Sequence, residues 1–473
     1  MTAVPERLRP LLAPDSPLQD LARRFSAAGH SLHLVGGSVR DALLGVTTPV
    51  PDYDLTTEAR PDAVLEIVRR WADHVWLQGQ AYGTIGGAKG PIRVEVTTFR
   101  AEVYRPDSRK PTVTFGDSLE TDLSRRDFTV NAMALSLPEP QLVDPYGGLD
   151  DLLVHRRLRT PLDPETSFLD DPLRMMRAAR FIAGLGLEPD PAVVAAATDL
   201  AGRLEVVSAE RIRDELSKLL VVDDPSPGLW FLVRTGLAAE FLPELPGLAL
   251  EQDPIHHHKD VLAHTIAVVA KTRPELVVRL AALLHDVGKP KTRSFGPDGV
   301  SFHLHDVVGA RMAEERLRAL RFPKDTIEAV TQLVLLHLRF HTYKMGWTDK
   351  AIRRYVRDAG PLLDDLNHLV RCDCTTRNQA KARALGRRMD DLEARIAELA
   401  EREELASIRP ALDGHRVMEL LGVGPGKVVG DALAMLLDAR IDDGPMSEEE
   451  AEQRLLAWAS GRGLLPEEKS DAS

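Results

Sequence analysis

The first 150 residues alternate between two spacings of apolar side chains. Strand-like runs lie at residues 31–37, 50–57 and 92–100, and helical spacing lies at residues 38–45 and 63–72. Residues 1–30 are predicted to form a further helix, with Leu11, Leu12, Leu18, Leu21 and Phe25 as its apolar set. Because helices and strands alternate, the pattern predicts a mixed sheet backed by helices.

Beyond residue 150 the strand signals fade and amphipathic helices predominate. Helical spacing covers residues 171–186, 209–221 and 227–236, and Pro243, Pro246 and Pro254 indicate a boundary. A helical segment at 256–376 holds most of the 15 histidines, a charged helix is predicted at 380–405, and two helices joined by a Gly-Pro-Gly turn follow. We therefore predict four parts, at residues 1–150, 151–245, 246–378 and 379–473.

Composition narrows the class of protein. The 473 residues suffice for about three domains, and the net charge of −12 excludes a wholly basic nucleic-acid coat but not local RNA-binding patches. The 5% aromatic content argues against broad base-stacking surfaces. Two cysteines cannot build a disulfide framework, and no apolar run reaches the roughly 18 residues of a membrane span. A soluble, reduced, cytoplasmic protein that does not bind membranes is expected.

A glycine pair marks the first candidate site. Gly36 and Gly37 follow a predicted strand and precede a predicted helix, where the backbone can approach an anionic ligand closely. The Ser38 hydroxyl and the Arg40 guanidinium could add to such a site. The alternative is an ordinary strand-turn-helix corner that needs glycine.

Three acidic side chains follow on predicted strands. Asp52 and Asp54 are two residues apart, so their carboxylates point to one face, and Glu95 lies in a second alternating strand. Carboxylates at close range repel unless a cation lies between them, and Mg²⁺ accepts carboxylate and phosphate oxygens together. Three acids on neighbouring strands could hold two metals for in-line phosphoryl displacement. A solvated strand end is the alternative for the aspartate pair.

These motifs, with LSRRDFTVNAMA at residues 123–134 and DPYGGLDDL at 144–152, resemble the class II tRNA nucleotidyltransferase and bacterial poly(A) polymerase family. The resemblance implies an α+β fold, in which a polymerase-β-like head precedes an all-α neck, an HD-type body and a tail. It also implies the following roles: Asp52 and Asp54 bind the catalytic metal, Glu95 supports them, Gly37 and Arg40 contact the triphosphate, and Arg126, Asp127 and Asn131 contact ribose and phosphate.

A second motif predicts how a base is selected. On one helix, Asp171 and Arg174 would share a face, and a carboxylate beside a guanidinium could read a base edge. An ordinary salt bridge on a solvated helix is the alternative. The segment resembles the family's Glu-Asp-x-x-Arg motif, with Asp170 in place of Glu, which implies selection of CTP and ATP without a nucleic-acid template. Arg177 and Arg180 would then lie near the phosphates.

The polar segment between Phe99 and Leu123 is predicted to be a functional loop. By resemblance, a loop near here helps the family to switch from C to A addition, and Arg109 and Lys110 are candidate contacts with RNA or nucleotide.

The histidines form a third group of candidate site residues. A buried His-Asp step such as His285–Asp286 is costly unless hydrogen bonds or a metal satisfy it. The order of His264, His285, Asp286 and Asp373 resembles the HD metal-dependent phosphohydrolases, which implies that these four residues bind a second divalent metal. His305 and His337 could serve a further metal or bind phosphate. The alternative is a retained fold with no activity.

Taken together, the resemblance implies addition of C, C and A to the 3′ end of tRNA, with Mg²⁺, CTP and ATP and release of pyrophosphate. Four alternatives stay open: a poly(A) polymerase, a partial enzyme that adds only C residues or only the final A, an HD phosphohydrolase with a relic head, and a non-catalytic tRNA-binding module. The oligomeric state is left open.

Overall fold

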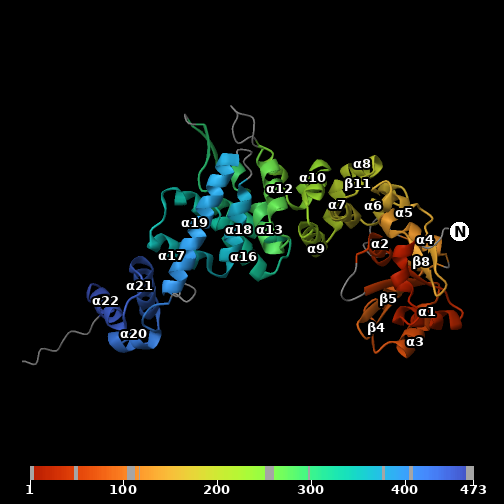
Figure 1. Cartoon of the computed structure of the whole chain (residues 1–473), viewed down its shortest axis with the longest axis horizontal. Helices are drawn as coiled ribbons and strands as arrows, with labels where there is room; N and C mark the ends of the chain where they lie inside the picture. The colour runs from red at the N-terminus through yellow and green to blue at the C-terminus, as the bar shows by residue number, and fades with distance from the viewer. Residues whose placement is uncertain are drawn as a thin grey trace, which may run out of the picture. The chain divides into compact units, whose positions relative to one another are not determined.

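The computed structural model describes residues 5–46, 52–103, 112–116, 118–250, 260–296, 299–374, 379–403 and 409–464. The chain divides into two compact units. Unit one comprises Met1–Pro246 with Ala319–Arg321, and unit two comprises Gly247–Arg318 with Phe322–Ser473 (Figure 1). The finer division into four parts stays a prediction.

Unit one contains a seven-stranded mixed sheet with the strand order β3-β4-β5-β2-β1-β8-β9. Its strands are β1 (Leu32–Val35), β2 (Asp52–Thr57), β3 (His74–Trp76), β4 (Thr84–Lys89), β5 (Ile92–Thr98), β8 (Ala134–Leu137) and β9 (Gln141–Val143). Strands β2 and β5 are parallel, and the other neighbouring pairs are antiparallel. The predicted mixed sheet and α+β fold are confirmed.

The helices of unit one come both between the strands and after them. They are α1 (Pro17–Ala27), α2 (Gly37–Leu44), α3 (Pro61–Trp71), α4 (Leu119–Ser124), α5 (Gly148–Leu153), α6 (Pro164–Asp170), α7 (Leu173–Leu185), α8 (Pro191–Asp199), α9 (Ala209–Leu220), α10 (Ser226–Arg234) and α11 (Leu237–Phe241). A short parallel pair, β10 (Arg157–Leu158) and β11 (Glu188–Pro189), lies among the later helices.

The apolar periodicity explains which face of the sheet the helices cover. Helix α3 buries Val64 and Val68. A Cβ atom on Gly87 of β4 would lie only 2.7 Å from Val68 Cγ1, so α3 packs directly on that strand. Because side chains alternate along a strand, Gly86 belongs to the opposite face. The register places Glu95 on that same face.

Two predicted elements differ from the structure. Residues 1–30 contain a 3-10 helix, Glu6–Leu12, and then α1, because prolines that lack a backbone N–H interrupt the predicted single helix. The predicted loop between Phe99 and Leu123 contains a hairpin of β6 (Arg100–Val103) and β7 (Thr112–Phe115), followed by α4. Arg109 and Lys110 lie outside the described residues.

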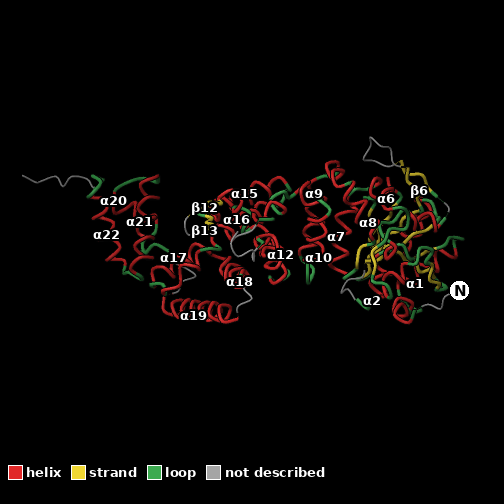
Figure 2. Tube along the Cα trace, turned by 90° about the horizontal axis from the view of Figure 1, so that it is seen from above, coloured by secondary structure: helices red, strands yellow, loops and turns green. Residues whose placement is uncertain are grey.

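The described part of unit two is helical apart from the hairpin of β12 (Arg293–Gly296) and β13 (Gly299–Phe302) (Figure 2). Its helices are α12 (Val261–Lys271), α13 (Leu276–Leu284), α14 (Lys289–Thr292), α15 (His305–Ala319), α16 (Lys324–Leu336), α17 (Asp349–Ala359), α18 (Leu363–Asp373), α19 (Gln379–Glu403), α20 (Gly414–Leu421), α21 (Lys427–Asp443) and α22 (Glu448–Ser460).

The C-terminal helices form a core of their own. Helices α20, α21 and α22 share a buried apolar cluster that includes Val417, Leu436 and Leu455. The sequence pattern predicted the first two helices but not α22. A capping box at Ser447 and Glu450 marks the start of that third helix and is a signal that sequence reading could have used.

Candidate active site

The predicted acidic residues lie side by side on the sheet face opposite α3. In the parallel pair β2–β5, Asp54 lies directly opposite Glu95. Glu95 in turn lies opposite Gly86 of β4, and Gly86 lies opposite Trp76 of β3. Asp52 is two residues before Asp54 and points to the same face. The three carboxylates therefore share one exposed surface, on the neighbouring strands β2 and β5.

Electrostatics at this surface favour a cation. Loss of hydration raises the pKa of Asp54; Arg126 opposes this rise and Asp52 adds to it. Loss of hydration likewise raises the pKa of Glu95, and the charges of Asp54 and Asp52 raise it further. The three carboxylates repel one another, and a bound cation would relieve this repulsion. A donor set made only of carboxylate oxygens fits a hard divalent ion such as Mg²⁺.

The glycine turn brings an arginine close to the carboxylates. Gly36 has φ 69°, and a Cβ atom there would lie 3.0 Å from Arg126 Nη1 and 3.7 Å from Asp54 Oδ2. The positive φ favours glycine, and a Cβ atom there would crowd the end of the Arg126 side chain. Helix α2 begins at the next residue, and the Ser38 hydroxyl donates to the Asp52 carbonyl at 3.3 Å. An anion held at this helix start would therefore lie beside the acids.

A network of buried charges links the predicted phosphate contacts. Arg40 Nη1 donates to Asn131 Oδ1 at 2.6 Å, and Asn131 Nδ2 donates to Asp127 Oδ1 at 3.0 Å. Arg177 Nε donates to the same carboxylate, at Oδ2, at 2.7 Å. Burial alone would raise the pKa of Asp127, but Arg177 holds it below its ordinary value. The network fixes the positions of Arg40 and Arg177 relative to each other.

Three guanidinium groups surround one aromatic ring at this network. Arg40, Arg177 and Arg180 lie 5.3, 5.4 and 4.7 Å from the centre of the Phe181 ring. Glu215 of α9, which is 4% exposed, forms an ion pair with Arg180 at 3.2 Å. Burial lowers the pKa of Arg180, while Glu215 opposes this effect. The gathered positive charge suits a polyanionic ligand.

The prediction that Asp171 and Arg174 share one helix is wrong. Asp171 caps the end of α6 in an extended conformation, and α7 begins only at Leu173, after Pro172. The proline interrupts the helix at the residue before it. The Asp171 carboxylate pairs with Arg211 of α9 at 3.0 Å, whereas Arg174 Nη1 donates to Ser167 Oγ at 2.8 Å. The side chains of Asp171 and Arg174 are therefore held by different partners, at the junction of α6 and α7.

Asp122 is a site residue that sequence reasoning missed. Its carboxylate is buried and pairs with Arg125 at 2.6 Å and with Arg126 at 3.5 Å. It also accepts from the Arg100 backbone N–H at 3.3 Å. The acid thereby positions Arg126 beside Gly36. Its place four residues before Arg126, the spacing of neighbours on a helix, is the signal that could have found it.

The predicted metal-binding residues of unit two also come together. His264, His285 and Asp286 offer ligand atoms within 4.8 Å of one another, and so do Asp286, His305 and His337. The fourth predicted ligand joins them, because Asp373 Oδ1 lies 2.9 Å from His264 Nε2 and 3.5 Å from His285 Nε2. Helix ends bring these residues together: His285 caps α13, His337 caps α16, and His305 begins α15.

The three buried histidines are oriented alike. His285, His305 and His337 each place Nδ1 against the backbone carbonyl three residues earlier, at 2.7, 2.8 and 2.6 Å. Their Nε2 atoms are buried without a well-formed hydrogen bond. Burial lowers the pKa of His337 to about 4, so this imidazole is neutral near pH 7. Burial also lowers the pKa of His305. Burial would lower the pKa of His285 as well, but the neighbouring Asp286 carboxylate raises it to about 10, so this pair holds either a proton or a cation in its place. Imidazole Nε2 atoms beside carboxylates form a donor set that fits a divalent transition metal.

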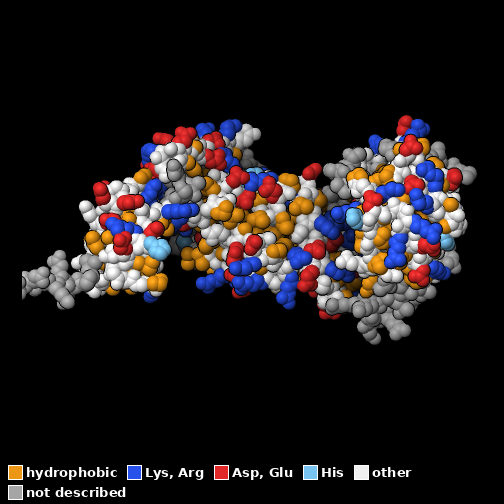
Figure 3. Space-filling view, turned by 90° about the horizontal axis from the view of Figure 1, so that it is seen from below, with side chains coloured by type: hydrophobic (Ala, Val, Ile, Leu, Met, Phe, Trp, Pro, Cys, Tyr) orange, Lys and Arg blue, Asp and Glu red, His pale blue; other side chains and the backbone are white. Residues whose placement is uncertain are grey.

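The face seen in Figure 3 carries basic and acidic side chains side by side. This face therefore shows no broad field of one charge sign. Among the described helices, none is both long and apolar enough to cross a membrane.

Three family models match successive parts of the chain. They describe the poly A polymerase head domain at residues 32–159, a probable RNA- and SrmB-binding site of polymerase A at residues 186–248, and the HD domain at residues 257–406. The predicted family resemblance is confirmed.

Curated relatives match along most of their own length. An A-adding tRNA nucleotidyltransferase from Deinococcus radiodurans is 37% identical over 439 residues, which cover 90% of this chain and 95% of that protein. A CC-adding tRNA nucleotidyltransferase from Thermus thermophilus is 34% identical over 441 residues, which cover 90% and 94%. A solved structure, the Bacillus stearothermophilus CCA-adding enzyme in complex with CTP, aligns with a TM-score of 0.66 at 24% identity, over 97% of this chain and 99% of that chain. This last match supports the shared fold.

Proposed function

Because the chain belongs to the class II tRNA nucleotidyltransferase and poly(A) polymerase family, we propose that it adds C, C and A in turn to the 3′ end of tRNA. CTP and ATP are the donors, and pyrophosphate is released. The observation that carries the proposal is the register that sets Asp54 beside Glu95, with Arg126 at the Gly36 turn next to them. This arrangement combines a cation site with an anion site, as nucleotidyl transfer requires.

In this reaction the residues of unit one hold the donor nucleotide. Asp52, Asp54 and Glu95 would hold Mg²⁺, which when bound neutralises phosphate charge and acidifies the attacking hydroxyl. Arg126, Arg40 and the start of α2 bind the triphosphate oxygens. Asp171 and Arg174 read the base from the α6–α7 junction, as acceptor and donor respectively. The buried Asp127–Arg177 pair keeps the phosphate contacts in place.

Product mapping at nucleotide resolution tests this function. Purified protein is given Mg²⁺, CTP, ATP and three versions of one tRNA transcript, which lack the last three, two or one nucleotides. We expect every transcript to be completed to the same C-C-A end. A ladder of A residues would replace the proposal with polyadenylation, and a failure to extend any transcript would overturn it.

Partial addition is the second candidate, because two relatives that match along 95% and 94% of their own length are named for A addition and for CC addition. The same transcripts separate these reactions. A CC-adding enzyme stops one nucleotide short on every acceptor, whereas an A-adding enzyme extends only the acceptor that already ends in C-C.

We also propose that the histidine cluster of unit two binds a divalent metal and hydrolyses a phosphate ester of RNA. Support comes from three buried Nε2 atoms that converge with the carboxylates of Asp286 and Asp373. Asp286 is common to both sets of candidate ligands, so it would be the central ligand. A terminal or 2′,3′-cyclic phosphate on RNA is the substrate class to assay.

Metal binding at this cluster predicts a thermal effect. A metal present at a hundredfold its Kd stabilises the folded state by about 2.7 kcal/mol. For a unit of this size, one calorimetric transition should therefore rise by roughly 5–10 °C with Mn²⁺. Asp286→Asn should abolish the rise, whereas His415→Asn, an exposed histidine on α20, should keep it. An equal rise in the Asp286 variant would contradict the proposed site.

A further inference from the structure

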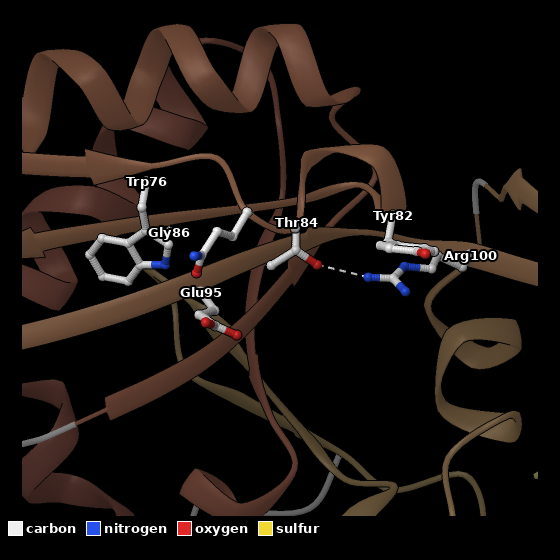
Figure 4. Close-up of a pocket in the computed structure, with 8 residues that line it drawn as sticks. Trp76, Tyr82, Thr84, Gly86, Glu95 and Arg100 are labelled. Atoms are coloured by element: carbon white, nitrogen blue, oxygen red, sulfur yellow. Dashed lines mark hydrogen bonds between the residues drawn. The ribbon is translucent and has the colours of Figure 1, made fainter. Parts of the chain in front are cut away.

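A hollow opens on the sheet face beyond Glu95. It has a volume of about 320 Å³. Its lining comes from β3, β4, β5 and the segments beside them: Trp76, Gln78, Gly79, Tyr82, Thr84, Gly86, Glu95 and Arg100. Figure 4 shows Trp76 and Glu95 at one end of the hollow, and Tyr82 and Arg100 at the other. None of the motifs used above for the donor nucleotide includes Trp76, Gln78 or Tyr82.

The hollow depends on the absence of a side chain at residue 86. A Cβ atom on Gly86 would lie 2.0 Å from the Trp76 indole, so the ring lies flat across β4. The indole reaches toward the next strand, where its N–H hydrogen bond lowers the pKa of Glu95 against the rise caused by lost hydration. One wall of the hollow is therefore fixed to a catalytic acid.

The sheet order places this hollow and the nucleotide site on opposite sides of the acids. Gly36 and Arg126 approach Asp54 from the side of β1. The hollow lies on the side of β4 and β3, across Glu95. In a phosphoryl displacement, the attacking and leaving oxygens are roughly in line with phosphorus between them. In the proposed reaction the triphosphate lies on the β1 side, so an in-line attack brings the acceptor hydroxyl from the side of the hollow.

We propose that this hollow binds the 3′-terminal nucleotide of the acceptor RNA and so delivers its 3′ hydroxyl to Glu95. The proposal rests on the proposed nucleotidyl transfer and identifies a second subsite for it. An acceptor end that changes from one base to another needs a contact that tolerates every base, and stacking on an aromatic ring provides one.

Tyr82 and Arg100 would contact different parts of the acceptor nucleotide. Tyr82 is 45% exposed, so its ring offers an open face on which a base can stack. Arg100 donates to Thr84 Oγ1 at 2.8 Å, and Thr84 shares a 2.9 Å hydrogen bond with Thr97. These two hydrogen bonds hold the Arg100 guanidinium at the rim of the hollow, where a backbone phosphate of the acceptor can pair with it.

A fluorescent acceptor tests the subsite without catalysis. The probe is the tRNA transcript with 2-aminopurine as its 3′-terminal base, titrated in Mg²⁺ without CTP or ATP. We expect stacking to quench the fluorescence on the wild-type protein. Tyr82→Ala should abolish the quench, Tyr82→Phe should restore it, and Phe295→Ala, an exposed aromatic of unit two, should leave it unchanged.

Steady-state kinetics supply the second readout. Tyr82→Ala should raise the KM for the tRNA transcript by roughly 5- to 150-fold, the range expected for one stacked base, and leave the KM for CTP unchanged. Equal quenching and equal KM in wild type and Tyr82→Ala would overturn the subsite while the wild type still extends tRNA. If the wild type extends no RNA at all, the proposed function itself fails, which is a different result.

Discussion

Substitution Asp54→Asn is expected to reduce nucleotide incorporation by at least about 1,000-fold, because several kcal/mol of charge stabilisation at the transferred phosphate depend on a bound metal. The side chain is exposed and keeps its size, so the sheet should fold as before. The loss should appear in kcat with CTP and with ATP alike, since the carboxylate contacts no base. Incorporation of CTP is measured on the tRNA transcript that lacks three nucleotides, and incorporation of ATP on the transcript that lacks only the last one.

The matched control is Asp62→Asn, an exposed acid in the first turn of α3 on the covered side of the sheet. It should incorporate nucleotides at the wild-type rate. Mn²⁺ should raise the calorimetric transition of unit two equally in both variants, because the histidine cluster is in that unit. Activity of Asp54→Asn within tenfold of wild type would show that the row of acids is not the reaction centre.

The sequence was sufficient to predict the acids but not their surroundings. Strand alternation alone places Asp52 and Asp54 on one face, whatever sheet they join. Which strand lies beside β2 is a non-local property, so the opposition of Glu95 to Asp54 depended on the family resemblance. The Trp76–Gly86 contact could not be predicted for the same reason, because the local pattern does not indicate which glycine an indole will cover.

Proline effects explain the error at the base-selecting motif. A spacing of three residues suggested one helix face for Asp171 and Arg174. Pro172 instead ends α6, and Asp171 turns to Arg211 on a helix forty residues later. The histidine cluster was easier to predict, because a His-Asp step at the end of an apolar helix is itself costly without partners. Its convergence from the ends of α13, α15 and α16 required the tertiary fold.

The Asp127–Arg177 pair should be the most sensitive point for the stability of unit one. Asp127 is 8% exposed, and its carboxylate has Arg177 as its cationic partner at 2.5 Å. Removal of one partner from a buried ion pair leaves an uncompensated charge, which costs about 3–5 kcal/mol. Glu215 would be affected less, because Arg180 still pairs with it at 3.2 Å.

Arg177→Met should therefore lower the midpoint of one calorimetric transition by roughly 10 °C at pH 7. The control is Arg70→Met in the same unit, whose partner Glu66 lies 2.5 Å away with both side chains largely exposed. Such a surface pair contributes less than about 1 kcal/mol, so that midpoint should move by only a few degrees. Equal shifts of the midpoint in the two variants would show that the buried pair contributes no more to stability than the surface pair.

The pH dependence of the same variants separates lost charge pairing from lost packing. Arg177 holds the pKa of Asp127 below its ordinary value, so the stability gained from the pair is present above about pH 4 and is lost as pH falls through that lowered pKa. The difference in midpoint between wild type and Arg177→Met should therefore shrink in acid. If only the packing of the arginine stem mattered, the difference would be the same at every pH. A shrinking difference would locate the effect in Asp127 itself, the carboxylate that also holds Asn131 toward Arg40 and so joins the stability of the unit to its phosphate site.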